Sequence, residues 1–513
     1  MKKYWNSAIS FTAWVLLAGI VSAQVPTQFP VKRPESVDTW KRDGWNAVER
    51  AKKEKIRKGK AKNVILFIGD GMGVSTLTAA RIFEGQMRGE SGEENRLSFE
   101  EFPNSALSKT YSANQQTSDS APTMSAIISG IKTDEGVLSV NQNVQHANYK
   151  TVAGNETMTL FEYAEEAGKS TGIVSTARLT HATPGACYAH TADRDWESDA
   201  DILSRKKDAY EAKFPDIARQ MLEFKYGDGL EVALGGGRSK YLPKETADPE
   251  YANRKGERLD GRDLTQEWMA KSKNATYVWN KQQFDAVDVR KTRRLLGLFE
   301  PSHMKYEFDR LKNASEEPSL SEMTSKAIDM LSTNKKGYVL MVEGGRIDHA
   351  HHDGNAYRAL RDTVALSDAV RTAVGKVDLD ETLIIVTADH SHTLFIQGYP
   401  IRGNNILGLV REVDTNGNLD ENDSVDRSKK PFTTLGYANG TGARGSERPI
   451  LTNETVLDPD YKQEANIPLS AETHGGEDVA IFATGVNSYL IRGSMEENWI
   501  FYVMADALRL GRK

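Results

Sequence analysis

The sequence contains almost no cysteine. Cys187 is the single one in 513 residues, so no disulfide can form within the chain. Stability must therefore come from the core, from bound metal ions or from a partner subunit. Cys187 stands in the stretch GACYAH with no second cysteine near it, and we expect a small buried side chain there instead of a reactive thiol.

Long apolar runs are absent beyond the first 23 residues. The early run ISFTAWVLLAGIV follows two lysines and ends in small residues before Gln24, which is typical of a secretory signal peptide over residues 1–23. A retained N-terminal anchor is the alternative, but this run is short for a membrane span. We expect the mature chain to be soluble, in the periplasm or secreted.

An excess of positive charge is lacking as well. The net charge is -6 and 27% of the residues are charged, which is ordinary for a globular protein and speaks against a nucleic-acid scaffold. The basic stretch WNAVERAKKEKIRKGKAK at 45–62 is interrupted by two glutamates. We therefore expect a solvated amphipathic helix there, as part of an N-terminal arm over residues 24–62.

Apolar runs of strand length alternate with helical patterns: NVILFIGDG, TGIVSTARL, GYVLMVEGG and TLIIVTADH. This alternation predicts an α/β fold whose large, mostly parallel sheet is covered by helices on both faces. Residues 397–472 are rich in glycine, proline and polar turns, which predicts a surface insertion. The α/β domain would then consist of residues 63–396 and 473–513.

Potential metal ligands follow these predicted strands. Asp70, Glu343 and Asp389 each stand just after an apolar run, and His181 and Thr183 follow another. Ligands of such sheets bind beyond the carboxyl ends of the strands. Carboxylate with hydroxyl suits magnesium, and histidine with carboxylate suits zinc, so the sequence predicts metal ions at this edge.

The stretch MVEGGRIDHAHHDGN continues the pattern. Asp348 and His352 are four residues apart and would share one face of a helix, although the spacing fits His351 nearly as well. His390 and His474 add two more imidazoles at the ends of later segments. Each residue alone fits a core or turn position, but their shared placement after strands favours a metal cluster.

TSDSAPTMSA at 117–126 supplies a hydroxyl, Ser120, where a helix could begin. Such a serine is usually an N-cap, but a helix N-terminus also attracts phosphate, and a metal ion beside the hydroxyl would turn it into a nucleophile. Arg194, in HTADRDWESDAD, either pairs with its flanking carboxylates or holds two phosphate oxygens with its planar fork.

The motifs GDGMG, DSA, THATP, DRDW, VEGGRIDHAHH, TADHSH and THGGED stand here in the order seen in alkaline phosphatases. From about residue 40 to its end the chain resembles that family. The sequences of its motifs are more similar to those of the animal branch than to those of the enteric bacterial enzyme. The resemblance implies the family's fold and a homodimer. The N-terminal arm and the 397–472 insertion, the family's crown, would lie at the dimer interface.

The resemblance also implies two Zn²⁺ ions and one Mg²⁺ ion. One zinc would be held by Asp348, His352 and His474. The other would be held by Asp70, Asp389 and His390, with Ser120 beside it. The magnesium would be held by Asp70, Thr183 and Glu343.

The resemblance to the animal branch implies roles for further residues. His181 and His349 match histidines of that branch, and are expected near the magnesium and the phosphate. A neutral imidazole at His181 would replace a carboxylate, so we expect weak magnesium retention and high turnover. A calcium site of the same branch falls on Glu250, Phe299, Glu300 and Glu317, with glutamate at the last position where the family has aspartate.

The resemblance implies hydrolysis of small phosphomonoester substrates through a phosphoserine at Ser120, with Arg194 on the transferred group. A phosphodiesterase or sulfatase on a similar two-metal sheet is one alternative. A non-catalytic zinc- or phosphate-binding protein is another. The chain ends in MADALRLGRK without the apolar tail that is exchanged for a lipid anchor in animal enzymes, so no membrane anchor is expected.

Overall fold

The structure is a computed structural model that describes residues 25–33, 35–420, 422–444 and 447–511. The predicted signal peptide falls on residues outside this described part. Within the described residues, we find no helix with the length and apolar character needed to cross a bilayer.

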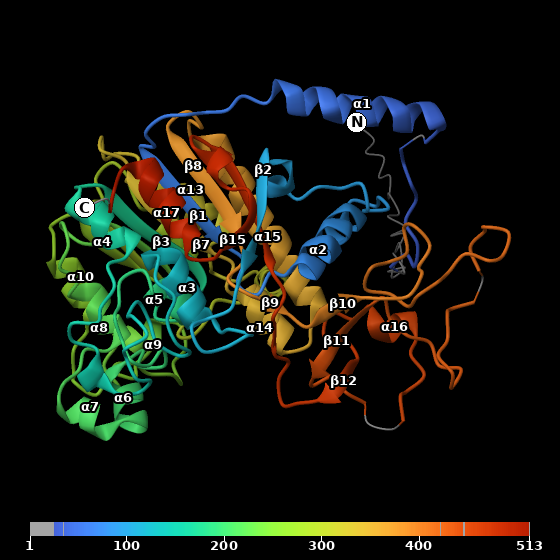
Figure 1. The fold of residues 1–513 in the computed structure, drawn as a ribbon. Helices are drawn as coiled ribbons and strands as arrows, with labels where there is room; N and C mark the ends of the chain where they lie inside the picture. The colour runs from blue at the N-terminus through green and yellow to red at the C-terminus, as the bar shows by residue number, and fades with distance from the viewer. Residues whose placement is uncertain (1–24, 34, 421, 445–446, 512–513) are drawn as a thin grey trace, which may run out of the picture.

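A ten-stranded sheet forms the centre of the molecule (Figure 1). Its strands lie in the order β15-β2-β14-β8-β1-β7-β3-β4-β6-β5. In sequence order they are β1 (Asn63–Ile68), β2 (Asn104–Lys109), β3 (Ser170–Arg178), β4 (Val232–Gly236), β5 (Ala275–Val278), β6 (Arg294–Leu298), β7 (Tyr338–Glu343), β8 (Thr382–Thr387), β14 (Val479–Gly485) and β15 (Gly493–Glu496). Among these described strands β14 alone runs antiparallel to its neighbours, so the predicted, mostly parallel sheet is confirmed.

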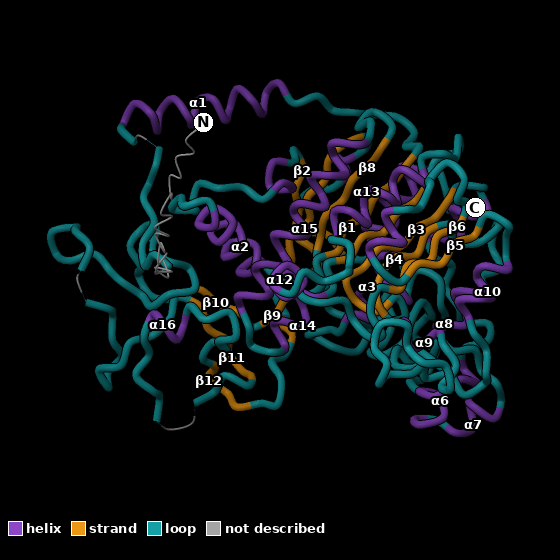
Figure 2. The backbone as a smooth tube through the Cα atoms, turned by 180° about the vertical axis from the view of Figure 1, so that it is seen from behind, coloured by secondary structure: helices purple, strands orange, loops and turns teal. Residues whose placement is uncertain are grey.

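Helices cover both faces of the sheet, as Figure 2 shows from behind. The helices of the described chain, of which α1 and α16 lie away from this sheet, are α1 (Val37–Lys53), α2 (Val74–Met87), α3 (Ser120–Ser129), α4 (Leu160–Glu166), α5 (Ala182–Gly185), α6 (Asp199–Arg205), α7 (Lys207–Glu211), α8 (Ile217–Leu222), α9 (Arg238–Tyr241), α10 (Leu264–Ala270), α11 (Lys281–Asp285), α12 (Glu307–Lys312), α13 (Leu320–Leu331), α14 (Arg346–His352), α15 (Ala356–Lys376), α16 (Asn453–Val456) and α17 (Trp499–Leu508).

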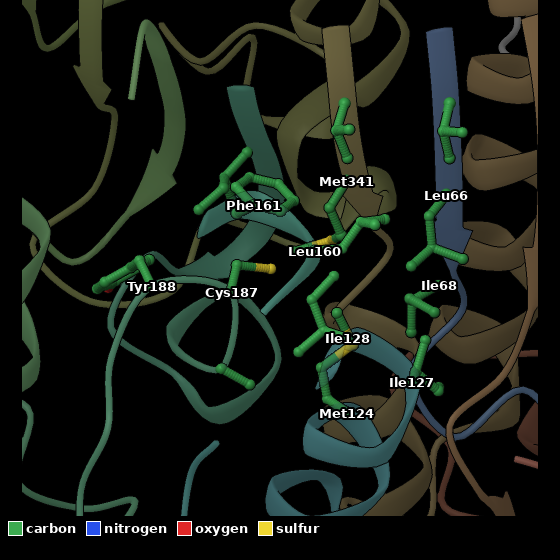
Figure 3. Packing of buried hydrophobic residues seen from close by; sticks show 14 of the residues in the cluster. Leu66, Ile68, Met124, Ile127, Ile128, Leu160, Phe161, Cys187, Tyr188 and Met341 are labelled. Atoms are coloured by element: carbon green, nitrogen blue, oxygen red, sulfur yellow. The ribbon is translucent and has the colours of Figure 1, made fainter. Parts of the chain in front are cut away.

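Alternate residues of the central strand enter two separate cores. Leu66 and Ile68 of β1 pack with α3, α4 and α17 on one face, whereas Ile65 and Phe67 pack with α2, α13 and α15 on the other. A strand buried on both faces has to be apolar at every position, which explains the continuous apolar runs of the sequence. Cys187 lies fully buried in the first core, as predicted (Figure 3).

The strands that carry the candidate ligands end side by side. Ile68 at the end of β1 is in register with Glu343 of β7 on one side and with Thr387 of β8 on the other. The turns that follow β1 and β8 therefore bring Asp70 and Asp389 to the same edge of the sheet as Glu343.

Two segments extend from the central body (Figure 1). Helix α1 begins at Val37, where the Ser36 side chain caps it, and ends at Lys53. The predicted helix at 45–62 is therefore wrong over its second half, because the following run of lysine and arginine offers like charges and no apolar face. The insertion predicted at residues 397–472 contributes β11 (Leu435–Gly440) and β12 (Ala465–Pro468), which form a three-stranded sheet with β10 (Leu394–Ile396).

Candidate active site

Ser120 is the first residue of α3 and is almost fully buried. Its Oγ lies 3.5 Å from Oδ1 of Asp70 and 3.2 Å from Nε2 of His390. The N-cap interpretation of this serine is wrong, because Asp119 occupies the N-cap position. A hydroxyl at the N-terminus of a buried helix, facing a carboxylate and an imidazole, is placed as a nucleophile would be.

Asp70, Asp389 and His390 form one group of converging ligand atoms beside this hydroxyl. Nε2 of His390 lies 3.4 Å from Asp70 and 3.5 Å from Asp389. Burial raises the pKa of Asp70 well above its usual value, and the neighbouring carboxylate of Asp389 raises it further. Two buried carboxylates this close together require a cation to remain ionised.

Asp348, His352 and His474 form a second group, which includes a residue that the sequence interpretation did not select, His392. Oδ1 of Asp348 lies 2.8 Å from Nε2 of His392, 3.2 Å from that of His352 and 3.4 Å from that of His474. An open cavity of about 450 Å³ lies over this group, lined in part by Asp119, His352 and His474.

His351 is directed elsewhere. Its Nε2 lies 3.0 Å from the hydroxyl of Thr76 in α2, and its Nδ1 lies 2.7 Å from the hydroxyl of Tyr437 in β11. The spacing in the sequence left His351 and His352 as alternatives, and the fold brings His352 to the Asp348 group.

A third group combines Asp70 and Glu343 with His181. Burial raises the pKa of Glu343 to about 7, although its hydrogen bond from Ser175 opposes the shift. The hydroxyl of Thr183 is buried without a hydrogen-bond partner among the described residues, as is Oε1 of Glu343.

These groups fit metal ions. Buried oxygen atoms of Asp70, Thr183, Glu343 and Asp389 lack hydrogen-bond partners among the described residues, a costly arrangement unless a cation binds there. The donors around Asp348 are mainly imidazoles, which zinc prefers, whereas those around Glu343 include hydroxyl and carboxylate oxygens, which magnesium prefers.

Arg194 is held in place from two sides. Its Nη1 donates to Oδ2 of Asp119 at 2.8 Å, and its Nη2 lies 3.0 Å from Nε2 of His181. Burial opposes its charge, but Asp119 outweighs this effect and raises the pKa of Arg194 above its usual value. The guanidinium is therefore a fixed positive charge next to the residue that precedes Ser120.

His349 lies beyond His181, with a distance of 5.4 Å between the ring centroids. His181 in turn lies 3.0 Å from Nη2 of Arg194, and the expected place of His349 near the phosphate stays a prediction. Its Nδ1 is buried and has no hydrogen-bond partner among the described residues.

The sequence interpretation missed two residues that support the Asp348 group. Nδ1 of His392 lies 2.5 Å from Oε2 of Glu472, whose other oxygen accepts hydrogen bonds from the backbone and side chain of Thr393. The backbone carbonyl of Glu472 lies 2.6 Å from Nδ1 of His352. The available signal was position, since His392 and Glu472 each stand two residues from a predicted ligand.

The residues predicted for calcium lie apart from this site. The ammonium of Lys305 contacts Glu300 at 2.6 Å and Glu317 at 3.0 Å, and Glu250 pairs with Arg238 at 2.9 Å. Within the described residues these carboxylates form no group of converging ligand atoms, and the nearby Phe299 is buried. A calcium ion would compete with Lys305 here, and the calcium site stays a prediction.

Known proteins resemble the chain over nearly its whole length. An alkaline phosphatase of Gadus morhua is 42% identical over 492 residues, which cover 94% of this chain and 99% of that protein. The tissue-nonspecific alkaline phosphatase of Felis catus is 44% identical, with 89% of this chain and 86% of that protein covered.

Solved structures share the fold. The alkaline phosphatase of Thermus thermophilus superposes with a TM-score of 0.63 at 23% identity, covering 90% of this chain and 94% of that one. The alkaline phosphatase of the Antarctic bacterium TAB5 superposes with a TM-score of 0.59 at 22% sequence identity, and the match covers 88% of this chain and 100% of that one. The family model described as alkaline phosphatase matches residues 61–510, a span that reaches from β1 to α17 and includes every ligand group. The chain therefore belongs to the alkaline phosphatase family.

Proposed function

We propose that the chain hydrolyses phosphate monoesters through a phosphoserine on Ser120, at a site that takes two zinc ions and one magnesium ion. The observation that carries this proposal is the buried Ser120 hydroxyl, 3.2 Å from His390 and 3.5 Å from Asp70, next to the guanidinium that Asp119 holds.

The chain's own groups would hold the metals. Asp348, His352 and His474 would bind one zinc, and Asp70, Asp389 and His390 the other. Asp70, Glu343 and Thr183 would bind magnesium. A structure with the same fold, a mutant of the TAB5 alkaline phosphatase, is described with magnesium in its M3 site. When bound, the metals lower the pKa of hydroxyl groups and neutralise the charge that develops on phosphate oxygens.

The protein groups then have distinct tasks. Oγ of Ser120 forms a bond to phosphorus while the bond to the leaving oxygen breaks on the opposite side. The serine proton passes to water, and the departing alkoxide takes up a proton from water and leaves as the alcohol. Two N–H groups of Arg194 hold the equatorial oxygens, and their fixed position avoids reorganisation during the reaction. Water then cleaves the serine ester and releases inorganic phosphate.

A labelling experiment tests this proposal. The protein reconstituted with zinc and magnesium is mixed with a ³²P-labelled aryl phosphate and quenched in acid. We expect label on the native protein and on Ser118→Ala, a control in the same loop, and none on Ser120→Ala. Labelled Ser120→Ala at the native yield would contradict the proposal.

The same preparation separates the alternatives. A phosphodiesterase would cleave the methyl aryl diester faster than the monoester, whereas the monoesterase should favour the monoester because its full set of free oxygens fits Arg194 and the metals. A sulfatase would prefer the aryl sulfate. A non-catalytic binding protein would show no turnover that chelation removes and zinc restores.

We further propose that the chain forms a homodimer. No residue of α1 is buried, and Trp40 and Trp45 are 53% and 69% exposed. Burial of such side chains in a subunit interface is favourable. Secretion, based on residues 1–23, belongs to this proposal too.

A further inference from the structure

Three imidazoles gather on the side of the site beyond Arg194. The ring centroids of His303 and His349 are 4.0 Å apart, and each lies 5.3 or 5.4 Å from that of His181. They come from three separate segments: His303 from the loop after β6, His349 from α14, and His181 from the start of α5. His303 has no part in the groups of converging metal ligands found among the described residues.

Arg346 adds a positive charge to this cluster, and the same charge acts on the buried carboxyl of Asp362. It is the first residue of α14, and its guanidinium stacks over the ring of Tyr306 at 3.8 Å. Its side chain forms no ion pair with a described residue, and its Nε is buried without a hydrogen-bond partner among them. In contrast, the nearby Arg178 is held by both carboxylate oxygens of Glu197, at 2.7 and 2.6 Å.

The ring of His303 is neutral. Burial lowers the pKa of His303 well below its usual value, and the positive charges of Arg178 and Arg346 lower it further. A neutral imidazole carries one N–H group and one acceptor nitrogen. Nδ1 of His303 faces the backbone N–H of Arg178 at 3.2 Å, and Nε2 of the same ring faces Nη1 of Arg178 at 2.5 Å.

Hydrogen-bond donors therefore outnumber acceptors here. A neutral ring of His303 cannot accept from Arg178 at both nitrogens, so one of these contacts brings two donors together. Nδ1 of His181 and of His349 and Nε of Arg346 add buried atoms without partners among the described residues. An anion is the ligand that supplies several acceptors to such a cluster and balances the charge of Arg346.

We propose that His303, His349 and Arg346 form a second anion subsite, which binds a further phosphate group carried by the leaving group of the substrate. His181 connects the two sites, since it lies 3.0 Å from Arg194 and beside the other two rings. The inference rests on the proposed function and deepens it: the preferred substrates are organic bisphosphates in which a short linker separates the two groups. Arginine with imidazole donors favours phosphate, whose oxygens accept from several directions.

A matched pair of substrates tests the subsite: 1,4-butanediol monophosphate and 1,4-butanediol bisphosphate, with the enzyme reconstituted with zinc and magnesium at low ionic strength. The two equivalent ends of the bisphosphate account for a factor of about two. We expect the ratio of kcat/KM, bisphosphate over monophosphate, to exceed this factor by about tenfold in the native protein, mainly through KM, and to fall as salt screens the subsite.

Variants assign the preference to the named residues. Arg346→Gln and His303→Gln should bring the ratio close to the statistical factor. Arg358→Gln is the control, because Arg358 lies 5.7 Å from the same Tyr306 ring but pairs with Asp309 and Asp460. Since the bisphosphate chelates metals equally in every assay, chelation cannot produce a difference between variants. If Arg346→Gln does not fold, the ratio of kcat/KM measured for His303→Gln alone decides the test.

The two possible failures are distinguishable. A native protein that turns over neither substrate contradicts the proposed function. Normal monophosphate turnover with a native ratio near two, or a ratio above two that both variants retain, overturns the subsite and leaves the proposed function intact.

Discussion

Nε2 of His392 lies 2.8 Å from Oδ1 of Asp348, so the carboxylate has a fixed orientation before any metal binds. Burial disfavours the charged form of His392, but the carboxylates of Glu472 and Asp348 outweigh this and raise its pKa to about 10. Removing such support of a ligand typically lowers metal affinity 10- to 100-fold. We expect this loss for zinc in His392→Gln, measured by competition with a chromophoric chelator.

His146→Gln is the control for this substitution, because His146 is half exposed and lies among other carboxylates, near Glu135 and Asp193. Equal zinc affinity in His392→Gln and the native protein would show that Asp348 needs no support from His392.

Arg194→Ala should lower kcat/KM for an aryl phosphate by about 10²-fold, the usual cost of losing one preorganised donor at a developing charge. Arg194→Lys should recover only part of this loss, since a lysine cannot hold two oxygens at once. Steady-state kinetics measure both values, with Arg219→Ala, whose arginine pairs with Glu223 on the surface, as the control. A loss below about twofold would reduce Arg194 to a structural ion pair with Asp119.

His181→Asp should retain magnesium more tightly and turn over more slowly. The new carboxylate would join Asp70 and Glu343 as an oxygen ligand, and would also pair with Arg194, which now contacts His181. Metal content after dialysis and kcat with and without added magnesium measure the two effects, and His146→Asp serves as the control. If neither quantity changed, the expected role of His181 would be wrong.

The raised pKa values of the Glu165 and Glu231 carboxyl groups lead us to expect a loss of stability at alkaline pH. Burial raises the pKa of Glu165 to about 7 and, together with the neighbouring Glu165, that of Glu231 to about 9. Both values are raised relative to the unfolded chain, so the folded state binds more protons and the free energy of unfolding decreases from about pH 4.5 to pH 9.

Glu231→Gln should weaken this dependence, because the amide can still accept the hydrogen bond from the backbone of Thr171 but does not ionise. Urea unfolding at pH 6 and pH 9 measures the change in the free energy of unfolding between these two pH values. Glu223→Gln is the control, since the pKa of Glu223 is lowered, chiefly by hydrogen bonds from Arg219 and Arg262 that outweigh its burial. A native-like slope in Glu231→Gln would refute the assignment.

The double variant Trp40→Ser and Trp45→Ser should shift the proposed homodimer toward monomer in sedimentation velocity at micromolar concentration, with little change in melting temperature per subunit. Both indoles lie on α1, which contributes no buried residue to the body of its own chain. Val25→Ser provides the control at an exposed apolar residue outside the helix. An unchanged dimer would exclude α1 from the interface.

The sheet was predictable because its strands are buried on both faces. Val64 to Ile68 enter two cores alternately, and this requirement appears in the sequence as an unbroken apolar run. The strands β10 to β12 were not predicted, since they are short, partly exposed and surrounded by the turn residues that dominated the local pattern.

Candidate ligands at strand ends were predictable for a similar reason, because Asp70, Glu343 and Asp389 each follow such a run. Supporting residues were not. Glu472 reaches His392 across 80 positions of sequence, and His303 meets His349 only because the loop after β6 folds back over α14. Contacts of this kind depend on the packing of distant segments, which no local pattern contains.

His351 has a mechanical consequence. Its two ring nitrogens tie α14 to α2 through Thr76 and to β11 through Tyr437. Asp348 and His352 stand on the same short helix. A displacement of β11 would therefore be transmitted through Tyr437 and His351 to the helix that carries two of the proposed zinc ligands.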